Sequence, residues 1–359
     1  MRAAIVHYWL LNMRGGEKVV EALCELLPDA DIFTLFYDPD RVSPAIRSHR
    51  IRTSFLQPFR KYHRSLLPWM PMALESFDLR GYDLVVSSES GPAKGVITSS
   101  TTRHVCYCHT PMRYLWDLYP AYRNEWVHSR VKRAIMTPLA NYLRLWDYAS
   151  AARVDEFVAN SANVQRRIWK TYRRDSVVVA PPVAVETFYW KPPQDYYLIV
   201  SELVAYKRLD MAVRAFARNG RKLRVVGDGP EFRPLRRMAG GNIEFCGRVS
   251  DEQLYELYAR CRAFLMPGEE DFGITPVEAL ASGKPVIALG RGGALETVPL
   301  TEPLGGLLYN DATEDSLREA IELWDRREHE LMPQALQAYA TKFSGAEFSA
   351  KMKPILFQP

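Results

Sequence analysis

The sequence contains no uninterrupted apolar run of the about eighteen residues that a membrane-spanning helix needs, so we expect no integral membrane segment. Its first residues, 1–11, lack a longer apolar core and a small-residue cleavage site, and are expected to form a first strand rather than a signal peptide. The chain has no internal repeat and no low-complexity tract. With 47% hydrophobic and 25% charged residues, it has the composition of a globular protein.

Cysteine and histidine are both sparse. The five cysteines are scattered, and Cys106 and Cys108 have the spacing of one face of a strand rather than that of a CxxC motif. The seven histidines form no HxxxH or HExxH pattern. We therefore expect no disulfide framework, no zinc site and no metal cofactor, and the cysteines are those of a protein in a reducing cytoplasm.

Short apolar runs alternate with helical patterns along most of the 359 residues. This alternation predicts parallel sheets covered by helices, and the length predicts two such α/β domains, each doubly wound and Rossmann-like. A proline-rich stretch at 181–193 can continue neither sheet and marks the boundary. The predicted strands are 3–10, 31–36, 84–87, 104–108, 156–159, 177–180, 197–200, 223–226, 243–245, 263–266 and 285–288. The predicted helices are 17–27, 164–172, 209–218, 251–261 and 275–282.

Positive charge is concentrated in one half of the chain. Residues 1–185 carry 25 Lys and Arg against 17 Asp and Glu, whereas residues 186–359 carry 22 against 25. Residues 41–74 hold seven basic side chains and no acidic one. Two stretches, 54–77 and 122–153, interleave basic with aromatic and aliphatic residues. Prolines interrupt the first, and neither is expected to form a long clean amphipathic helix.

The segment 267–278 is the most informative part of the sequence. A predicted strand ends at Met266, and a helix is expected to start with Thr275 as N-cap and Pro276 at the first helical position. Glu278 then stands where a capping-box acid belongs, which is a purely structural role. The same helix start directs N–H groups and a positive dipole toward the sheet edge, where a diphosphate could bind. Glu270 and Glu278 could both face that crevice.

The spacing of Glu270 and Glu278 around an internal Phe-Gly resembles the signature of family four of the retaining glycosyltransferases. Further motifs agree in order across most of the chain: Gly15-Gly16, CHTP at 108–111, ANS at 159–161, SELVAYKRLD at 201–210, VGDGPE at 226–231, GRV at 247–249 and GRGGALE at 290–296. The chain is most similar to bacterial mannosyltransferases of exopolysaccharide and O-antigen assembly. The resemblance implies the GT-B fold, in which two Rossmann-like domains face a cleft.

The resemblance also implies domain roles. Residues 1–184 would bind the acceptor and residues 185–340 the nucleotide-sugar donor, while residues 341–359 would pack back on the N-terminal domain. The nucleotide sugar is a co-substrate, and no metal is expected. Three residues would be catalytic: His109 beside the donor sugar, Lys207 at the diphosphate and Glu270 at the sugar hydroxyls.

The donor-binding residues follow from the same motifs. Gly15 and Gly16 would let the backbone approach a phosphate, and Arg208 would assist Lys207. At Glu202 the family commonly has arginine, so one expected cation is absent unless Arg208 replaces it. The remaining donor-binding residues would contact the nucleobase, ribose, diphosphate and sugar of the donor. They are Arg248, Val249, Phe272, Gly273, Ile274, Thr275 and Glu278.

Several alternatives stay open at this point. The donor could be a UDP-sugar rather than GDP-mannose, and the same fold could serve a nucleotide-sugar epimerase or hydrolase. A nucleotide-binding or nucleic-acid-binding protein is a non-enzyme alternative, although the basic stretches match no RRM, KH or helix-turn-helix pattern. Residues 13–16 do not supply the glycine pattern of a dehydrogenase. Asp38-Pro39-Asp40 is a DxD sequence in a predicted proline turn, which favours a loop over a metal site.

The acid-free basic stretch suggests a further partner. Arg60, Lys61 and Arg64 lie close in sequence to Trp69, and such a mixture suits an anionic membrane surface. Acceptors in polysaccharide pathways of this kind are often lipid diphosphates. The expected acceptor is therefore lipid-linked or a glycan, and the expected location is cytoplasmic, peripheral on the inner face of the membrane. No nucleic-acid partner is expected.

Overall fold

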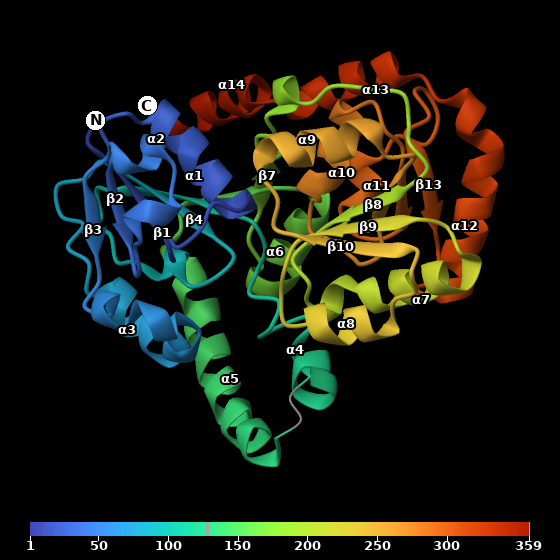
Figure 1. Cartoon of the computed structure of the whole chain (residues 1–359). Coiled ribbons are helices and arrows are strands. Elements are labelled where there is room, and N and C mark those ends of the chain that lie inside the picture. Colours follow the sequence, from blue (N-terminus) through green and yellow to red (C-terminus); the bar gives the residue numbers. More distant parts are fainter. Residues whose placement is uncertain (127–128, 359) are drawn as a thin grey trace. The chain divides into compact units, whose positions relative to one another are not determined.

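The computed structural model describes residues 1–126 and 129–358. The chain forms two compact units: the first comprises Met1–Pro182 with Phe348–Pro359, and the second comprises Val183–Glu347. Each unit contains one parallel sheet with helices on both faces (Figure 1). The predicted fold class, two doubly wound α/β domains, is confirmed.

The sheet of the first unit has seven parallel strands in the order β3-β2-β1-β4-β5-β6-β7. Alternate residues of β1 enter different cores: Ala3 and Ile5 pack with α1 and the end of α14, whereas Ala4 and Val6 pack with α3. The strands are β1 (Ala3–His7), β2 (Asp31–Thr34), β3 (Ile51–Thr53), β4 (Leu84–Glu89), β5 (Arg103–Cys108), β6 (Glu156–Ala159) and β7 (Ser176–Val178). The helices are α1 (Gly15–Leu26), α2 (Pro44–Arg47), η2 (Gln57–Trp69), α3 (Met70–Glu75), α4 (Tyr119–Ala121), α5 (Arg130–Ser150) and α6 (Ala162–Tyr172), and α14 (Gly345–Leu356) returns to this unit.

The sheet of the second unit has six parallel strands in the order β10-β9-β8-β11-β12-β13. Helices α7 and α12 pack on one face around the buried Trp324, and Figure 1 shows α9 and α10 on the other face. The strands are β8 (Tyr197–Val200), β9 (Leu223–Val226), β10 (Ile243–Gly247), β11 (Phe264–Met266), β12 (Val286–Leu289) and β13 (Gly306–Tyr309). The helices are α7 (Leu209–Asn219), α8 (Phe232–Met238), α9 (Asp251–Arg260), α10 (Ile274–Ala281), α11 (Ala294–Thr297), α12 (Glu314–Arg327) and α13 (Pro333–Ala340).

Every predicted strand and helix is present, with ends shifted by up to three residues. Two strands were not predicted. β3 has only three residues and lies inside the basic stretch, where its one apolar residue gives no periodic signal. β13 starts at Gly306, whose φ of +152° and close approach to the Val286 carbonyl oxygen suit glycine alone. β13, Gly-Leu-Leu-Tyr, has no β-branched residue, and β3 is too short for its two β-branched residues to form an alternating pattern.

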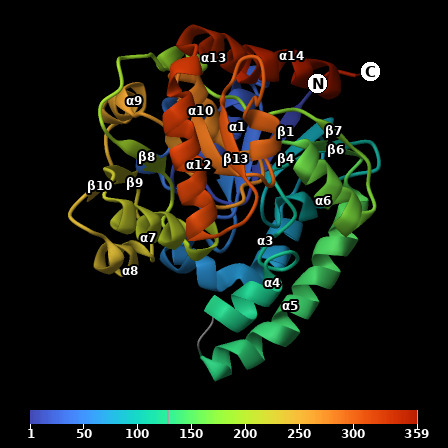
Figure 2. The ribbon, with the colours of Figure 1, turned by 90° about the vertical axis from the view of Figure 1, so that its right-hand side faces the viewer.

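The expectation that stretch 122–153 contains no long helix was wrong, although residues 127 and 128 lie outside the described residues. Helix α5 runs for 21 residues and includes Pro138. Pro138 is exposed, so the carbonyl group that lacks its usual N–H partner can be hydrated. Figures 1 and 2 show that the N-terminal half of α5 stands away from the sheet of its unit. No helix among the described residues is long and apolar enough to cross a membrane.

Candidate functional site

Two of the predicted catalytic residues form an ion pair in the second unit. The Nζ of Lys207 lies 2.7 Å from Oε1 of Glu270, and the two side chains are 21% and 22% exposed. Burial opposes the charge of Lys207, but the carboxylate of Glu270 and the neighbouring Tyr206 outweigh it and hold the pKa of Lys207 above its usual value. Lys207 is therefore a fixed cation that is still partly open to solvent.

Glycines hold the Glu270 loop against its neighbours. A β-carbon on Gly268 would lie 2.7 Å from the backbone of Lys207, so this glycine lets the loop after β11 reach Lys207. Likewise, a β-carbon on Gly293 would lie 2.0 Å from the Phe272 carbonyl oxygen. The Gly293 N–H donates to the Glu270 carbonyl oxygen at 2.8 Å. The GRGG segment, residues 290–293, therefore supports the loop that carries Glu269, Glu270 and Asp271, which we call the acidic loop.

The Gly-Asp-Gly turn after β9 supports the Lys207 loop in the same way. A β-carbon on Gly227 would lie 1.9 Å from the Ser201 carbonyl oxygen, and one on Gly229 would lie 2.4 Å from that of Leu203. The Leu203 N–H donates to the Asp228 carbonyl oxygen at 3.0 Å. This turn packs on the backbone that carries Lys207, which is a positioning role.

The N-cap of helix α10 lies two residues before the predicted one, and the capping box is not formed. Gly273, with φ of +88°, is the N-cap, Ile274 is the first helical residue, and no side chain caps the helix. Glu278 lies in the second turn, where its carboxylate accepts a 2.7 Å hydrogen bond from the hydroxyl of the buried Tyr258. Thr275 follows Ile274 and caps nothing, because a glycine in the left-handed conformation already ends the loop.

The other predicted donor residues of the second unit are dispersed over the loops. Phe272 is buried and packs edge-to-face on Phe343, with ring centroids 5.6 Å apart, so it is a structural anchor of the acidic loop. Arg248 and Val249 follow β10, with Arg248 exposed and Val249 half-buried. The negative charge of Glu202 helps to raise the pKa of Lys207, so Glu202 lies within electrostatic reach of that cation.

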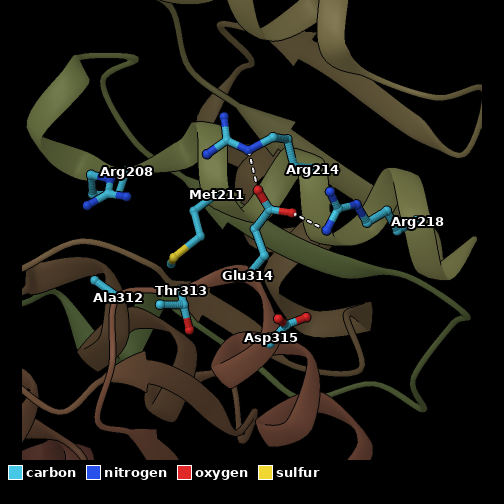
Figure 3. Close-up of a pocket in the computed structure, with 8 residues that line it drawn as sticks. All are labelled: Arg208, Met211, Arg214, Arg218, Ala312, Thr313, Glu314 and Asp315. Atoms are coloured by element: carbon cyan, nitrogen blue, oxygen red, sulfur yellow. Dashed lines mark hydrogen bonds and ion pairs between the residues drawn. The ribbon is translucent and has the colours of Figure 1, made fainter.

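Arg208 lines a cavity whose lining includes neither Lys207 nor Glu270. This cavity of about 310 Å³ lies between α7 and the start of α12 (Figure 3). Arg208 pairs with Asp210 at 3.6 Å, and Glu314 on the opposite wall pairs with Arg214 and Arg218. The arginines of this cavity are thus engaged by carboxylates of the chain itself.

In the first unit, Gly16 and His109 lie side by side. A β-carbon on Gly16 would lie 3.6 Å from the Nε2 of His109, and Nε2 shares a 2.9 Å hydrogen bond with the hydroxyl of Ser88. Burial, together with the nearby His7, lowers the pKa of His109 to about 3. The imidazole is therefore neutral at pH 7. Gly15 and Gly16 are the first residues of α1.

Glu17, in the first turn of α1, caps the start of this helix. The backbone N–H of Arg14 donates to the carboxylate of Glu17 at 3.1 Å. Burial raises the pKa of Glu17 to about 7, against the opposing effect of its hydrogen bonds and of Arg14.

A buried ion network fixes the strand end beneath His109. Glu89, the last residue of β4, accepts a 2.7 Å hydrogen bond from the backbone N–H of His109 through its carbonyl oxygen. Its carboxylate lies 3.3 Å from Nζ of Lys94, which also pairs with Asp147 of α5. Trp116 and Tyr172 donate to the second oxygen of Asp147 at 2.7 and 2.9 Å. This network ties β4 to α5.

The residues predicted to meet a membrane are exposed on η2. Arg60, Lys61, Arg64 and Trp69 all face solvent, as do Phe55, Phe59 and Tyr62. Leu66 and Leu67, which also lie on η2, are partly buried against the core of the first unit.

The DxD sequence forms a short helical turn. Asp38 is its N-cap and accepts a hydrogen bond from the Asp40 N–H at 3.3 Å. Within residues 1–126 and 129–358, no group of three or more His, Cys, Asp or Glu side chains is arranged to hold a metal ion.

Family models match both units. The model described as Glycosyltransferase Family 4 matches residues 13–186, and the model described as Glycosyl transferases group 1 matches residues 185–343. Among curated relatives, the chain is 26% identical over 198 residues to the O-antigen chain mannosyltransferase C of Escherichia coli, which covers 49% of this chain and 53% of that protein. It is 36% identical over 142 residues to the GDP-mannose-dependent monoacylated alpha-(1-6)-phosphatidylinositol monomannoside mannosyltransferase of Corynebacterium glutamicum, covering 35% and 36%. The chain thus spans about half or less of the length of these relatives.

Solved structures share the fold along the whole chain. The Anabaena protein HepE, in complex with UDP and glucose, has a TM-score of 0.70 at 17% identity and covers 100% of both chains. WaaG, a glycosyltransferase involved in lipopolysaccharide biosynthesis, has a TM-score of 0.71 at 16% identity, covering 99% of this chain and 100% of its own.

The two sheets and the two family matches define a GT-B glycosyltransferase, a class of transferase enzymes. Within that class, the chain belongs to glycosyltransferase family 4, as its motifs indicated.

Sequence reasoning missed several residues that shape these sites. Ser88 and Tyr258 hydrogen-bond to the predicted residues His109 and Glu278, and His7 hydrogen-bonds to Ser88. Gly268 lets two loops meet. His7 and Ser88 lie at strand ends, where a polar residue in an apolar run was the available signal.

Proposed function

We propose that this chain transfers a hexose, mannose from GDP-mannose, to a lipid-linked or glycan acceptor in the synthesis of a cell-surface polysaccharide such as exopolysaccharide or O-antigen. The observation that carries the proposal is the pairing of Lys207 with Glu270 beside the start of α10. A fixed cation and the free N–H groups of a helix start suit a diphosphate leaving group. The choice of mannose is supported by the relatives named as GDP-mannose-dependent or O-antigen mannosyltransferases.

In this proposal, Lys207 binds the diphosphate and stabilises its charge as it leaves. Glu270 accepts hydrogen bonds from donor-sugar hydroxyls, and Glu278, oriented by Tyr258, accepts those of the ribose. The acceptor hydroxyl attacks the face from which the nucleotide departs, and the leaving phosphate takes its proton. The new bond then keeps the anomeric configuration of the donor. No bound metal takes part.

A UDP-sugar is the second candidate donor, because the structural neighbour HepE is a complex with UDP and glucose. Thermal unfolding with GDP, UDP, ADP and dTDP separates the two, since a ligand of the native state raises the unfolding temperature. We expect GDP to give the largest shift. A larger shift with UDP would indicate that the donor is a UDP-sugar rather than GDP-mannose. No shift with any of the four nucleotides would contradict a nucleotide-sugar site.

We further propose a peripheral location on the cytoplasmic face of the membrane. The exposed cations Arg60, Lys61 and Arg64, with the exposed ring of Trp69, form what we call the basic surface. Helix α5 packs through Trp146 on the same core as Leu66 and Leu67 of η2, and it carries further exposed apolar side chains, Val131, Ile135, Tyr142 and Leu145. Cations attract anionic headgroups, and apolar side chains gain from burial at the interface.

A further inference from the structure

His7 is the last residue of β1, and its side chain is fully buried, with 0% exposed. Its Nδ1 lies 2.8 Å from the Ser88 carbonyl oxygen, and because a carbonyl only accepts, Nδ1 carries the proton. The other nitrogen, Nε2, is buried with no hydrogen-bond partner among the described residues. Burial lowers the pKa of His7 to about 4, so at pH 7 Nε2 presents a lone pair. A buried acceptor of this kind costs stability unless water or a ligand satisfies it.

Gly16 provides an independent observation at the same place. A β-carbon on Gly16 would lie 3.5 Å from Cε1 of His7 and 3.6 Å from Nε2 of His109, which are ordinary contact distances. Gly16 lies in the first turn of α1 and is not among the glycines with positive φ. Alanine would therefore fit both the backbone and the packing, and it would favour the helix. What alanine would remove is the space between the two imidazole rings.

We propose that His7 binds one hydroxyl group of a sugar substrate in the space beside Gly16, with its Nε2 as hydrogen-bond acceptor and the ring of His109 bordering the same space. The inference rests on the proposed function. The lone pair of a neutral imidazole suits a hydroxyl, which can donate, and opposes a phosphate oxygen, which carries charge and accepts. Ser88 fixes both rings, through its carbonyl oxygen for His7 and its hydroxyl for His109.

Two substitutions test this assignment from opposite directions. His7→Asn places an amide near the position of Nδ1, where it can still donate to Ser88, but removes Nε2. Gly16→Ala leaves both rings and fills the space between them with a methyl group, and we expect this variant to unfold at a temperature no lower than the wild type. His104→Asn is the matched control, because His104 is equally buried but both of its ring nitrogens have partners, the Ser87 hydroxyl at 2.8 Å and the Arg153 carbonyl oxygen at 3.3 Å.

The hydroxyl can come from the donor sugar or from the acceptor, and two measurements distinguish these sources. Calorimetry compares the affinities for GDP-mannose and GDP, with UDP-glucose and UDP as the second pair. Transfer assays give the amount of lipid extract that supports half-maximal rate. A donor-sugar hydroxyl predicts that His7→Asn and Gly16→Ala each weaken nucleotide-sugar binding about 3- to 10-fold, the range for one neutral hydrogen bond, with nucleoside diphosphate binding unchanged.

An acceptor hydroxyl instead predicts unchanged nucleotide-sugar affinity and a similar rise in the half-saturating amount of extract. If the wild type binds and transfers while both variants stay within twofold of it in both measurements, the inference is overturned and the proposed function stands. A loss equal for nucleoside diphosphate and nucleotide sugar would also overturn it, since it would indicate a phosphate contact. A wild type that binds none of the four probes would overturn the proposed function, and the inference with it.

Discussion

The Nζ of Lys207 and Oε1 of Glu270 are 2.7 Å apart, although the two residues belong to separate loops that follow β8 and β11. These strands are neighbours in the second sheet, so their carboxyl ends bring the loops together. Ligands of open parallel sheets bind at this edge. A cation already oriented by a carboxylate needs little reorganisation when an anionic ligand arrives, which is the condition for effective electrostatic stabilisation.

Replacing Lys207 with alanine should weaken binding of a nucleoside diphosphate far more than binding of the nucleoside, because Lys207 is assigned to the phosphates. Charge-assisted hydrogen bonds contribute about 1.5–3 kcal/mol, so a loss of roughly 10- to 100-fold is expected. Calorimetric titration of GDP and guanosine measures both. Lys222→Ala, which removes a lysine of the same unit that is 66% exposed, is the control and should change neither affinity. Equal losses for both ligands in Lys207→Ala would rule out the phosphate assignment.

Glu270→Gln should leave the fold intact while reducing turnover by roughly 10²-fold, the range for loss of a positioned polar group in an active site. The amide keeps the size of the side chain but loses the charge that holds Lys207. Steady-state rates give the turnover, and thermal unfolding checks the fold. Glu244→Gln, on the exposed surface of β10, provides a carboxylate-to-amide control that should keep full activity. Activity near that of the wild type in Glu270→Gln would remove this residue from the site.

The buried His7 should make stability depend on pH. Burial lowers its folded-state pKa to about 4 from the ordinary 6.5, so between these values the unfolded chain binds more protons and stability falls as the pH falls. Between pH 7.5 and 5, the wild type should lose about 2 kcal/mol more unfolding free energy than His7→Asn does, since the about 1.5 pH units below 6.5 each contribute about 1.4 kcal/mol. Urea unfolding at the two pH values measures this difference. Equal losses in both proteins would show that the pKa of His7 is the same in the folded and the unfolded chain, and would contradict a lowered pKa.

The basic surface should bind vesicles that contain phosphatidylglycerol and should not bind neutral vesicles. Each cation near an anionic surface contributes on the order of 1 kcal/mol, and 0.5 M salt, with a Debye length of roughly 4 Å, should release most of the protein. Replacing Arg60, Lys61 and Arg64 with serine should abolish co-sedimentation while leaving nucleotide binding unchanged. Binding that ignores lipid charge and salt, or that survives the triple change, would contradict the proposed surface.

Most of the fold could be predicted because the two patterns that specify its strands and helices lie within short stretches of the sequence. Apolar runs separated by helical periodicity specify the strands and helices, and β6, β8 and β9 begin and end at the predicted residues. The failures occurred where the local signal was weak or opposed: a three-residue strand at β3, a glycine at the start of β13, and Pro138 within α5. β3 and β13 form because they pair with strands distant in sequence, whereas Pro138 is tolerated because it lies on an exposed face of α5.

The site was predictable in its motifs but not in its contacts. The positions of Lys207 and Glu270 in the sequence do not predict how close the two side chains lie. Their close approach depends on Gly268, which has no side chain to separate the two loops. Glu278 was expected to form a capping box with Thr275. Because Gly273 is the N-cap instead, the Glu278 carboxylate accepts a hydrogen bond from Tyr258. His7 carried no motif at all, and its orphaned nitrogen becomes visible only when the strands are assembled.

Glycosyl transfer itself tests the central claim most directly. The protein is incubated with radiolabelled GDP-mannose, or UDP-glucose in parallel, together with a lipid extract, and the products are separated by chromatography. We expect label to move from GDP-mannose into a lipid or glycan product with release of GDP, and nuclear magnetic resonance should show the donor's anomeric configuration in the new bond. Free sugar as the sole labelled product would indicate a hydrolase, an epimerised nucleotide sugar would indicate an epimerase, and unchanged substrate with every donor and extract would contradict the transferase account.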